Sequence, residues 1–234
     1  MAGPFSAPPL DNFRTSPIGV VPKKNSLKFR MITVLSSPKG MAINDFISDD
    51  EASVSFNTFD SAAKIVASLG PGALMAKLDM KSAFRICPVR VSDWNLLGFS
   101  FSGYFFVDLC LPFGLRSSVN RFTQLASTLL WIMPTNYNIT HCTHYLDDFF
   151  LVGPPSSQQC FLNMSKTIDL FSNLGIPLAD DKQVGPTARI TFLGIEIHST
   201  DLSLRLPADK LHDLLFEIST WARKKNAQNA SSYP

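Results

Sequence analysis

Two adjacent aspartates, Asp147 and Asp148, interrupt the segment from His141 to Val152, which is otherwise largely apolar and aromatic. Buried carboxylates without partners cost free energy, so this segment must either lift both acids into water at a turn or present them to a divalent cation. The flanks are strongly apolar and the pair has no neighbouring glycine, which favours the cation. The two acids are therefore a candidate metal site, with a solvated turn as the alternative.

A second acid of the same kind stands at the end of another apolar run. Asp79 closes the segment Leu74–Asp79, which reads as a short strand. If this strand lies beside the one that carries Asp147 and Asp148, the three carboxylates meet at one sheet edge. Three such groups would hold two Mg²⁺ ions, or Mn²⁺ because oxygen ligands accept both, and would suit phosphoryl or nucleotidyl transfer.

The charges are unevenly distributed along the chain. The 21 lysines and arginines and the 19 aspartates and glutamates leave a net charge of +2. This balance excludes a uniformly basic nucleic-acid coat but leaves room for a local basic groove. Residues 12–44 carry basic side chains and no acid, whereas residues 45–60 carry acids and no base. The basic stretch suits a polyanion, with ordinary exposed segments as the alternative.

Apolar spacing and turn residues predict strands and helices in irregular alternation, which is typical of an α+β fold. Strands are expected over Ile18–Val21, Phe29–Val34, Leu74–Asp79 and Ile190–Ile197, with a hairpin over Phe99–Leu111 that turns at Ser102-Gly103. The hydrophobic fraction of 45% excludes a wholly disordered chain, because it is enough to form a core.

Four helices are expected, each with apolar residues at helical spacing, and the last three each have a start signal. The first runs from Phe59 to a stop at Gly70; the others follow Ser117-Ser118, Ser156-Ser157 and Pro207. The stripes of these last three are Val119, Phe122, Ala126, Leu129 and Met133; Phe161, Met164, Ile168 and Phe171; and Leu211, Leu214, Leu215, Ile218 and Trp221. Residues 224–234 are expected to form a frayed polar tail.

The cysteines, the lengths of the apolar runs and the first residues indicate the cellular compartment in which the protein is expected. Cys87, Cys110, Cys142 and Cys160 form no CxxC pair, which argues against structural zinc and favours free thiols in a reducing environment. No apolar run approaches the roughly 20 residues that span a bilayer, and the first residues do not resemble a signal peptide. The expectation is an intracellular protein, cytoplasmic or nuclear, with no membrane partner.

Taken in order along the chain, several segments resemble the motifs of reverse transcriptases. Tyr145-Leu146-Asp147-Asp148 is similar to the YxDD signature, and Asp79–Phe84 is similar to the first catalytic motif, an aspartate followed five positions later by an aromatic residue. The remaining resemblances are Ser16–Arg30 to the fingers hairpin, Leu111–Ser118 to the nucleotide and template motif, Leu174–Lys182 to the motif that ends in a lysine, and Thr191–Ile195 to the primer-grip hairpin. The ordered set is specific although each motif alone is weak.

The resemblance implies an α+β right-hand polymerase, with fingers, an antiparallel palm sheet backed by helices, and only the start of a thumb. Residues 1–15 would be an extended segment, 16–221 the polymerase and 222–234 a polar tail, with fingers at roughly 16–72 and 85–115. The amino-acid sequences of several segments resemble those of DIRS-type retrotransposons, which carry a tyrosine recombinase. The expected partners are an RNA or DNA template with its primer, deoxynucleotides, and other parts of the element polyprotein, such as RNase H and the recombinase.

The resemblance also assigns roles to individual residues. Asp79 and Asp147 would bind the two metal ions with help from Asp148, and Lys182 would protonate the leaving pyrophosphate. Phe84 would be a steric gate that clashes with the 2′-hydroxyl of a ribonucleotide. The remaining assignments are dNTP binding by Lys23, Lys24, Arg30, Ser82, Ala83, Phe113 and Gly114, and primer or template contact by Tyr145, Arg116, Phe192, Leu193 and Gly194.

Two functional hypotheses from different classes remain after the sequence. The first is the RNA-directed DNA polymerase core, which the intact Asp79, Phe84 and Asp147-Asp148 favour. The second is a catalytically silent nucleic-acid-binding or assembly remnant of a mobile element, which the missing thumb residues favour. A two-metal nuclease would fit the carboxylates but would not account for Phe84 or for Leu111–Ser118.

Overall fold

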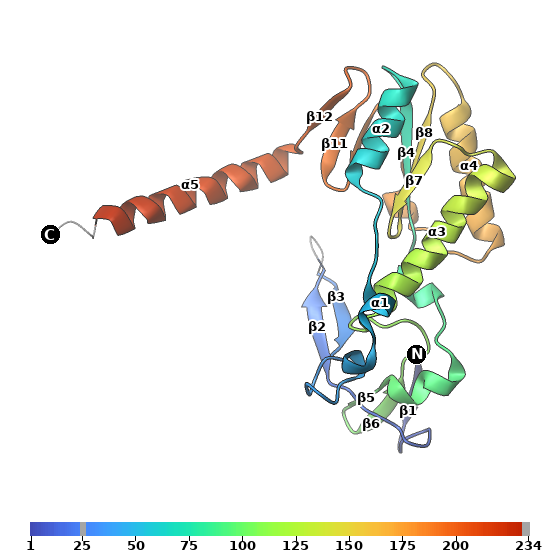
Figure 1. The fold of residues 1–234 in the computed structure, drawn as a ribbon, viewed down its shortest axis with the longest axis vertical. Helices are drawn as coiled ribbons and strands as arrows, with labels where there is room; N and C mark the ends of the chain where they lie inside the picture. Colours follow the sequence, from blue (N-terminus) through green and yellow to red (C-terminus); the bar gives the residue numbers. More distant parts are fainter. Residues whose placement is uncertain (24–26, 231–234) are drawn as a thin grey trace.

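The computed structural model describes residues 1–23 and 27–230. Figure 1 shows two groups of elements along the long axis of the molecule, with the main sheet and its helices in one group and two smaller sheets in the other. Long helix α3 (Ser118–Tyr137) belongs to the first group and runs toward the second. The mixture of helices with antiparallel sheets confirms the predicted α+β class.

The main sheet has four strands in the order β7-β8-β4-β9, all antiparallel. They are β7 (Cys142–Tyr145), β8 (Asp148–Gly153), β4 (Leu74–Asp79) and β9 (Val184–Thr187). Strands β4 and β8 pair without interruption from Leu74 opposite Gly153 to Asp79 opposite Asp148. Their side chains are nearly all buried, which explains why both strands read as continuous apolar runs.

Both faces of this sheet are covered. Helices α3 and α4 (Gln159–Asn173) enclose one core, in which Leu78, Phe122, Phe149 and Phe171 are fully buried. Helix α2 (Phe59–Leu69) and a second sheet enclose the other. Large aromatic side chains that bury this much surface fix the position of β4 and β8 between the two layers.

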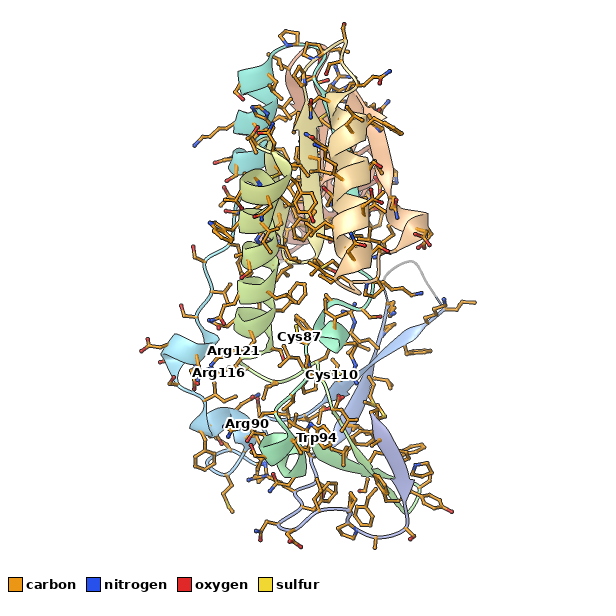
Figure 2. The ribbon with its side chains drawn as sticks, turned by 90° about the vertical axis from the view of Figure 1, so that its right-hand side faces the viewer. Cys87, Arg90, Trp94, Cys110, Arg116 and Arg121 are labelled. Carbon is orange, nitrogen blue, oxygen red and sulfur yellow. The ribbon has the colours of Figure 1, made fainter. Side chains whose placement is uncertain are left out.

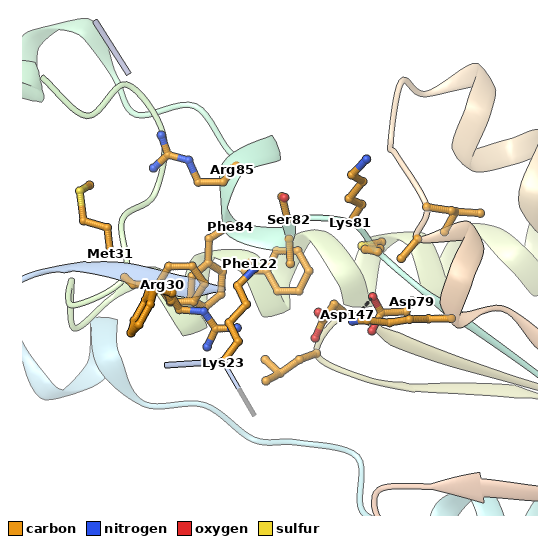
Figure 3. A pocket seen from close by; sticks show the side chains of 18 of the residues that line it. Lys23, Arg30, Met31, Asp79, Lys81, Ser82, Phe84, Arg85, Phe122 and Asp147 are labelled. Carbon is orange, nitrogen blue, oxygen red and sulfur yellow. Dashed lines mark hydrogen bonds and ion pairs between the residues drawn. The ribbon is translucent and has the colours of Figure 1, made fainter. Parts of the chain in front are cut away.

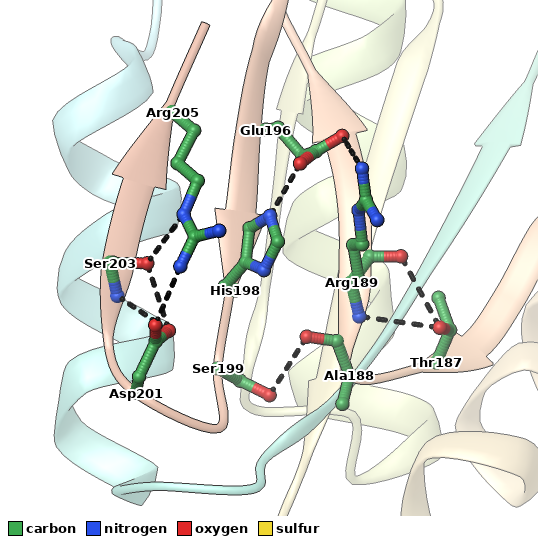
Figure 4. Close-up of polar contacts among 9 residues, drawn as sticks. All are labelled: Thr187, Ala188, Arg189, Glu196, His198, Ser199, Asp201, Ser203 and Arg205. Carbon is green, nitrogen blue, oxygen red and sulfur yellow. Dashed lines mark hydrogen bonds and ion pairs between the residues drawn. The ribbon is translucent and has the colours of Figure 1, made fainter. Parts of the chain in front are cut away.

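The second sheet, order β10-β11-β12, contains β10 (Arg189–Phe192), β11 (Ile195–His198) and β12 (Ser203–Arg205). Its edges carry ion pairs from Arg189 Nη2 to Glu196 Oε2 and from Arg205 Nη2 to Asp201 Oδ2, each 2.9 Å long (Figure 4). Both arginines are more than half exposed, so these pairs add little to stability.

The other group of elements contains a two-stranded ribbon and a three-stranded sheet. The ribbon is β2 (Ile18–Pro22) paired with β3 (Phe29–Thr33), as predicted, with its turn partly outside the described residues. The sheet has the order β1-β6-β5, from β1 (Ala2–Phe5), β6 (Tyr104–Val107) and β5 (Gly98–Phe101). The first fifteen residues therefore contribute a strand rather than only an extended segment. Short helix α1 (Asp49–Ala52) lies at the start of α3.

Several predicted elements differ in their boundaries. The Phe99–Leu111 hairpin turns at Ser102-Gly103 as expected but ends at Val107. His141–Val152 and Ile190–Ile197 each fold back as a hairpin, because Leu146, Leu193 and Gly194 adopt left-handed φ angles. Apolar spacing alone predicted one strand over Ile190–Ile197, whereas the resemblance of Thr191–Ile195 to the primer-grip hairpin predicted the turn that the structure has.

The helix starts and one stripe also differ. No side-chain bond caps α3 at Ser117; instead Ser118 Oγ donates to the carbonyl of Pro112. Helix α4 begins at Gln159, and Ser157 Oγ accepts from the Gln159 amide at 3.3 Å. The stripe predicted for α4 was wrong at Phe161, which is 60% exposed, because the buried face is rotated toward Cys160, Asn163 and Thr167.

Helix α5 (Ala208–Ala230) projects away from the rest of the molecule (Figure 1). Pro207 lies immediately before it, and the helix continues through most of the stretch predicted to be a frayed tail. Its apolar stripe is exposed, with Leu211 at 44% and Trp221 at 67%. Over the described residues, no helix has the length and apolar character that crossing a membrane requires.

The four cysteines are free, and Cys160 is buried while the other three are half-buried. Burial raises the pKa of Cys142 and of Cys160 to about 11. Both thiols therefore stay protonated near neutral pH and act as small apolar side chains.

Candidate active site

Three aspartates meet at the edge of the main sheet. The last register pair of β4 and β8 places Asp79 directly opposite Asp148. Asp147 stands in the adjoining turn, which Leu146 forms with a φ of 52°. The Met80 amide donates to the Asp147 carbonyl at 3.0 Å, so the turn is also fastened to the chain that leaves β4. The sequence expectation that these acids lie side by side is confirmed.

The surroundings of these acids disfavour negative charge. Burial raises the pKa of the Asp148 carboxyl from 3.8 to about 6, and the neighbouring Asp79 and Asp147 add to this shift. Burial also raises the pKa of Asp147, with a further contribution from Asp79. Close carboxylates in a poorly solvated place need a cation if all are to ionise.

One lysine supplies part of that compensation. Lys182 Nζ lies 2.9 Å from Asp79 Oδ1, and this hydrogen bond raises the pKa of the lysine. Lys182 reaches the sheet edge from the 3-10 turn Asp180–Lys182, which follows the contact between the Ala179 amide and the Asp79 carbonyl. The sequence placed Lys182 near the pyrophosphate, and the structure brings it to the carboxylates themselves.

A cleft of about 820 Å³ opens between the sheet edge and the β2–β3 ribbon. Figure 3 shows carboxylates on one side and basic and aromatic side chains on the other. The predicted site residues that line it are Lys23, Arg30, Asp79, Ser82, Ala83, Phe84, Phe113, Asp147 and Lys182. Acids, cations and rings from separate stretches of the sequence thus meet in one cavity.

The aromatic wall of the cleft is built on Phe84. This side chain belongs to the 3-10 turn Ala83–Ile86, which Ser82 opens with a left-handed φ of 58°. The Phe84 ring centre lies 5.0 Å from that of Phe113 and 5.7 Å from that of Phe122. These separations are typical of favourable aromatic pairs, so the ring is held on two sides.

The basic side of the cleft is attached through the loop after β6. The guanidinium carbon of Arg30 lies 4.5 Å from the Phe113 ring centre, within cation–π range. The Thr33 amide donates to the Phe113 carbonyl at 2.9 Å. A Cβ atom on Gly114 would stand 1.9 Å from the Thr33 carbonyl oxygen, so only glycine fits there.

Asn44 clamps the same loop from outside the cleft, and sequence reasoning missed it. Its Nδ2 donates to the Gly114 carbonyl and its Oδ1 accepts from the Arg116 amide, both at 2.8 Å. The only sequence signal was an asparagine next to the switch from basic to acidic residues, which predicts no such contact.

Some predicted residues lie outside this cavity. Lys24 falls outside the described residues, and the remaining ones do not line the cleft: Gly114, Arg116, Tyr145, Asp148, Phe192, Leu193 and Gly194. The Arg116 guanidinium binds the Ile47 carbonyl at 2.9 Å and pairs with Asp49, so it holds α1 at the start of α3 (Figure 2). This contact does not bring Arg116 to the carboxylates.

The other outlying residues pack against the main sheet. The Tyr145 ring lies 5.2 Å from Phe56, directly beside the carboxylate turn. Phe192 is 1% exposed and its ring centre lies 4.8 Å from that of Phe150, so it belongs to the core. Leu193 and Gly194 form the partly exposed turn of the β10–β11 hairpin.

His144 holds the carboxylate turn through a hydrogen bond, and the sequence did not predict this role. Its Nδ1 lies 3.1 Å from the Leu146 carbonyl and its Nε2 lies 3.3 Å from Ser127 Oγ. Because a carbonyl only accepts, Nδ1 carries the proton. Burial lowers the pKa of His144, which keeps the ring neutral. The imidazole thus links α3 to the left-handed turn.

The donor set of the sheet edge fits a hard divalent cation, because it consists of aspartate oxygens. Within residues 1–23 and 27–230, no three acidic, histidine or cysteine side chains are arranged closely enough to hold an ion as they stand. The Lys182 ammonium already pairs with Asp79, so it fills part of the role of a cation. A metal ion on Asp79 Oδ1 would compete with Lys182 for this oxygen.

The comparisons with known proteins agree with this architecture. Residues 21–197 match the family model described as reverse transcriptase (RNA-dependent DNA polymerase). A foamy viral protease–reverse transcriptase in complex with double-stranded DNA has a TM-score of 0.66 at 20% identity, over 83% of this chain and 31% of that one. The foamy viral complex with an RNA/DNA hybrid gives 0.63 at 20% identity, over 83% and 24%.

This likeness to solved structures establishes the fold. The chain spans less than a third of the length of these two foamy viral chains. No curated protein matches the sequence.

Proposed function

Because the reverse transcriptase family model covers residues 21–197, the chain belongs to the reverse transcriptase family, and we propose that it is the core of an RNA-directed DNA polymerase. It would transfer nucleotides from dNTPs to a primer 3′-hydroxyl on an RNA or DNA template. The observation that carries this proposal is the meeting of Asp79, Asp147 and Asp148 at one sheet edge, where Asp79 and Asp147 line a cleft with a basic and an aromatic side.

In this proposal, Asp79 and Asp147 hold two Mg²⁺ ions, with Asp148 assisting and Mn²⁺ as an alternative. Bound ions would offset the charge of the attacking hydroxyl and of the leaving pyrophosphate. The raised pKa values of Asp147 and Asp148 indicate carboxylates that need such a cation. Lys182 would hold its proton close to the departing pyrophosphate once it releases Asp79.

The opposite side of the cleft would bind the nucleotide. Arg30 and Lys23, with Lys24, would hold the triphosphate, since arginine binds phosphate oxygens in pairs and lysine acts as a point charge. Phe84 would press on the sugar, with the backbone of Ser82 and Ala83 beside it. Phe113 and Gly114 would lie against the nascent base pair.

Primer and template contacts are proposed around the sheet edge. Tyr145 lies beside the carboxylate turn. The turn of Phe192, Leu193 and Gly194 belongs to the β10-β11-β12 sheet, which packs against the main sheet. Arg116 would face the template from the loop after β6, although its guanidinium is engaged by Ile47 and Asp49.

We also propose a domain division and an origin. Fingers would comprise roughly residues 16–72 and 85–115, and the palm the rest up to 221. The amino-acid sequences of the motifs resemble those of DIRS-type retrotransposons, so RNase H and tyrosine recombinase segments of the same element are the proposed further partners. Activity within a retrotransposon would require an intracellular setting.

The test is primer extension by the purified chain on an RNA template with dNTPs and Mg²⁺. Wild type should extend the primer and Asp147→Asn should not. Asp169→Asn is a matched control, because Asp169 is exposed on α4 away from the cleft. Extension by all three proteins would contradict the assigned metal site.

A folded wild-type chain that extends nothing would favour the second candidate, a silent binding or assembly remnant. Thermal melting with and without Mg²⁺ separates the two, because an ion that binds only the folded state raises its stability. The polymerase proposal predicts stabilisation by Mg²⁺ that Asp147→Asn abolishes and Asp169→Asn retains.

A further inference from the structure

An ion pair with a buried carboxylate, Arg85 with Asp108, lines the cleft next to the aromatic wall. Arg85 Nη1 donates to Asp108 Oδ2 at 2.7 Å, and Arg85 Nη2 lies 2.5 Å from Asp108 Oδ1. The Asp108 side chain is 2% exposed, whereas that of Arg85 is 31% exposed. Within the described residues, Asp108 Oδ1 has no hydrogen bond and is compensated by the ion pair alone.

The pair joins the two elements that carry the aromatic wall. Arg85 follows Phe84 in the turn Ala83–Ile86, and Asp108 follows β6 on the way to Phe113. A short backbone ladder runs parallel to it, with the Leu111 amide donating to the Cys87 carbonyl at 3.0 Å. The ladder fixes the backbones, and the ion pair fixes the turn itself.

Arg85 lines the cleft, but its guanidinium does not point toward the carboxylates. Figure 3 shows its guanidinium directed away from Asp79 and Asp147. Its hydrogen bond to Asp108 raises the pKa of Arg85, so the cation is permanent. Arg85 thus acts on the cleft through the turn that it anchors.

We propose that Arg85 and Asp108 are a positioning pair that fixes the Phe84 ring and thereby sets the preference for deoxyribonucleotides over ribonucleotides. This inference rests on the proposed function, because it needs Phe84 to act as the gate. A steric gate works only if its ring cannot retreat by about 1 Å, since misplacements of that size change rates by roughly 100-fold. Phe113 and Phe122 hold two sides of the ring, and the ion pair holds its backbone.

An arginine–aspartate pair is well suited to fixing the position of a turn. A guanidinium presents two parallel donors in a rigid plane, so its grip on a carboxylate fixes orientation as well as distance. Lysine would keep the charge but lose the second bond. A buried carboxylate left without its cation is strongly unfavourable, so Asp108 cannot exchange Arg85 for water at little cost.

The experiment measures kcat and KM for one dNTP and the matching rNTP, in primer extension by the full chain. We expect Arg85→Met and Asp108→Asn to lower the dNTP preference by about 10- to 100-fold, mainly through a lower KM for the rNTP. Arg85→Lys should lie between them and wild type. Arg90→Met is the control, because Arg90, labelled in Figure 2, does not line the cleft and its substitution should leave the preference unchanged.

The decisive comparison uses Phe84→Ala. If Arg85 acts through the ring, adding Arg85→Met to Phe84→Ala should not change the preference further. A merely structural role would lower kcat for both nucleotides equally and would add to the effect of Phe84→Ala. Either an unchanged preference in Arg85→Met and Asp108→Asn or a fully additive double variant would overturn the inference.

Two further outcomes are distinguishable. Wild type that prefers dNTPs and loses extension in Asp147→Asn upholds the proposed function whatever Arg85 does. Wild type without extension overturns the proposed function and this inference with it. If Arg85→Met fails to fold, Arg85→Lys and Asp108→Asn decide, since both keep the size of the side chain close to the original.

Discussion

The two sides of the cleft are built in opposite ways. The carboxylate side is the end of an uninterrupted β4–β8 ladder with Leu78 and Phe149 fully buried beneath it. The basic side is a two-stranded ribbon in which Val20 is 69% exposed and Phe29 is 64% exposed. An isolated two-stranded ribbon is marginally stable by itself, so its position depends on its few attachments.

The difference indicates a division of work. Groups that must stay in place to within a fraction of an ångström during chemistry are fixed by core packing. Groups that meet an incoming charged nucleotide are carried on a ribbon fastened mainly through the loop at Phe113 and Gly114. Substitutions on the carboxylate side should therefore affect turnover, and those on the ribbon should affect nucleotide binding.

The largest effect is expected on the carboxylate side. Asp79→Asn or Asp147→Asn should lower kcat by roughly 10³-fold or more, equivalent to about 4 kcal/mol of lost transition-state stabilisation. The KM for dNTP should change little. Steady-state primer extension measures both values, with Asp169→Asn as control. A kcat within tenfold of wild type would break the comparison.

The next largest effect concerns the attachment of the ribbon. Gly114→Ala adds a Cβ that would stand 1.9 Å from the Thr33 carbonyl oxygen, at a φ of 110°. We expect the free energy of unfolding to fall by about 3 kcal/mol in total, which exceeds the roughly 1–2 kcal/mol that a left-handed alanine costs by itself. Denaturant unfolding measures the loss.

Gly40→Ala is the matched control for this attachment. Gly40 has a φ of 85° and no atom within 4 Å of the place that a Cβ would occupy, so only the conformational cost applies. Equal losses in Gly40→Ala and Gly114→Ala would show that the close approach to Thr33 is not what holds the ribbon.

A smaller effect is expected from the ribbon cations. Arg30→Met removes a charged partner of the triphosphate, worth about 1.5–3 kcal/mol, so the KM for dNTP should rise roughly 10- to 100-fold. The kcat at saturating dNTP should stay within a few-fold of wild type. A Michaelis–Menten series measures the two values, with Arg90→Met as control, and a loss confined to kcat would sink this assignment.

The pH dependence of stability sharpens the carboxylate side. The folded-state pKa of Asp148 is about 6 against an ordinary value of 3.8, so the folded protein binds more protons between these values. Without metal, its contribution to stability should fall as pH rises from about 4 to about 6 and then level off. Asp148→Asn should flatten this fall, as calorimetric melting in chelator would show.

Mg²⁺ should reverse the loss above pH 6, because it binds the ionised carboxylates of the folded state. A melting profile of Asp148→Asn that falls as steeply as wild type over this range would contradict the burial of an uncompensated carboxylate at the sheet edge.

The smallest effect is expected beneath the carboxylate turn. His144→Leu removes the donor to the Leu146 carbonyl and should cost about 1 kcal/mol of stability and a few-fold in kcat. His144→Asn keeps a donor at the same position and should recover part of both. Thermal melting and extension rates measure the changes, and identical behaviour of the two variants would exclude this hydrogen bond.

The sequence predicted the carboxylate side of the cleft well because short, continuous stretches of the chain determine it. Leu74–Asp79 and the run after Asp147 are apolar stretches bounded by acids, and a strand with both faces buried gives such a run. The pairing of Asp79 with Asp148 then needed only that the two strands be neighbours.

Other parts could not be predicted because their determinants are distant in the sequence. Arg85 and Asp108 are ordinary charged residues 23 positions apart, and only the folded chain shows that they meet. The rotation of α4 that exposes Phe161 depends on the sheet it packs against. The helix expected to stop before Lys224 continues to Ala230, although its apolar stripe is exposed along the part whose side chains are described.

The division of work between the two sides is tested most directly by single-nucleotide incorporation over a wide dNTP range, comparing Asp147→Asn with Arg30→Met. The account predicts that high dNTP restores the rate of Arg30→Met to within a few-fold of wild type and does not restore Asp147→Asn. Equal failure of both variants at saturating dNTP, or recovery of Asp147→Asn, would contradict it.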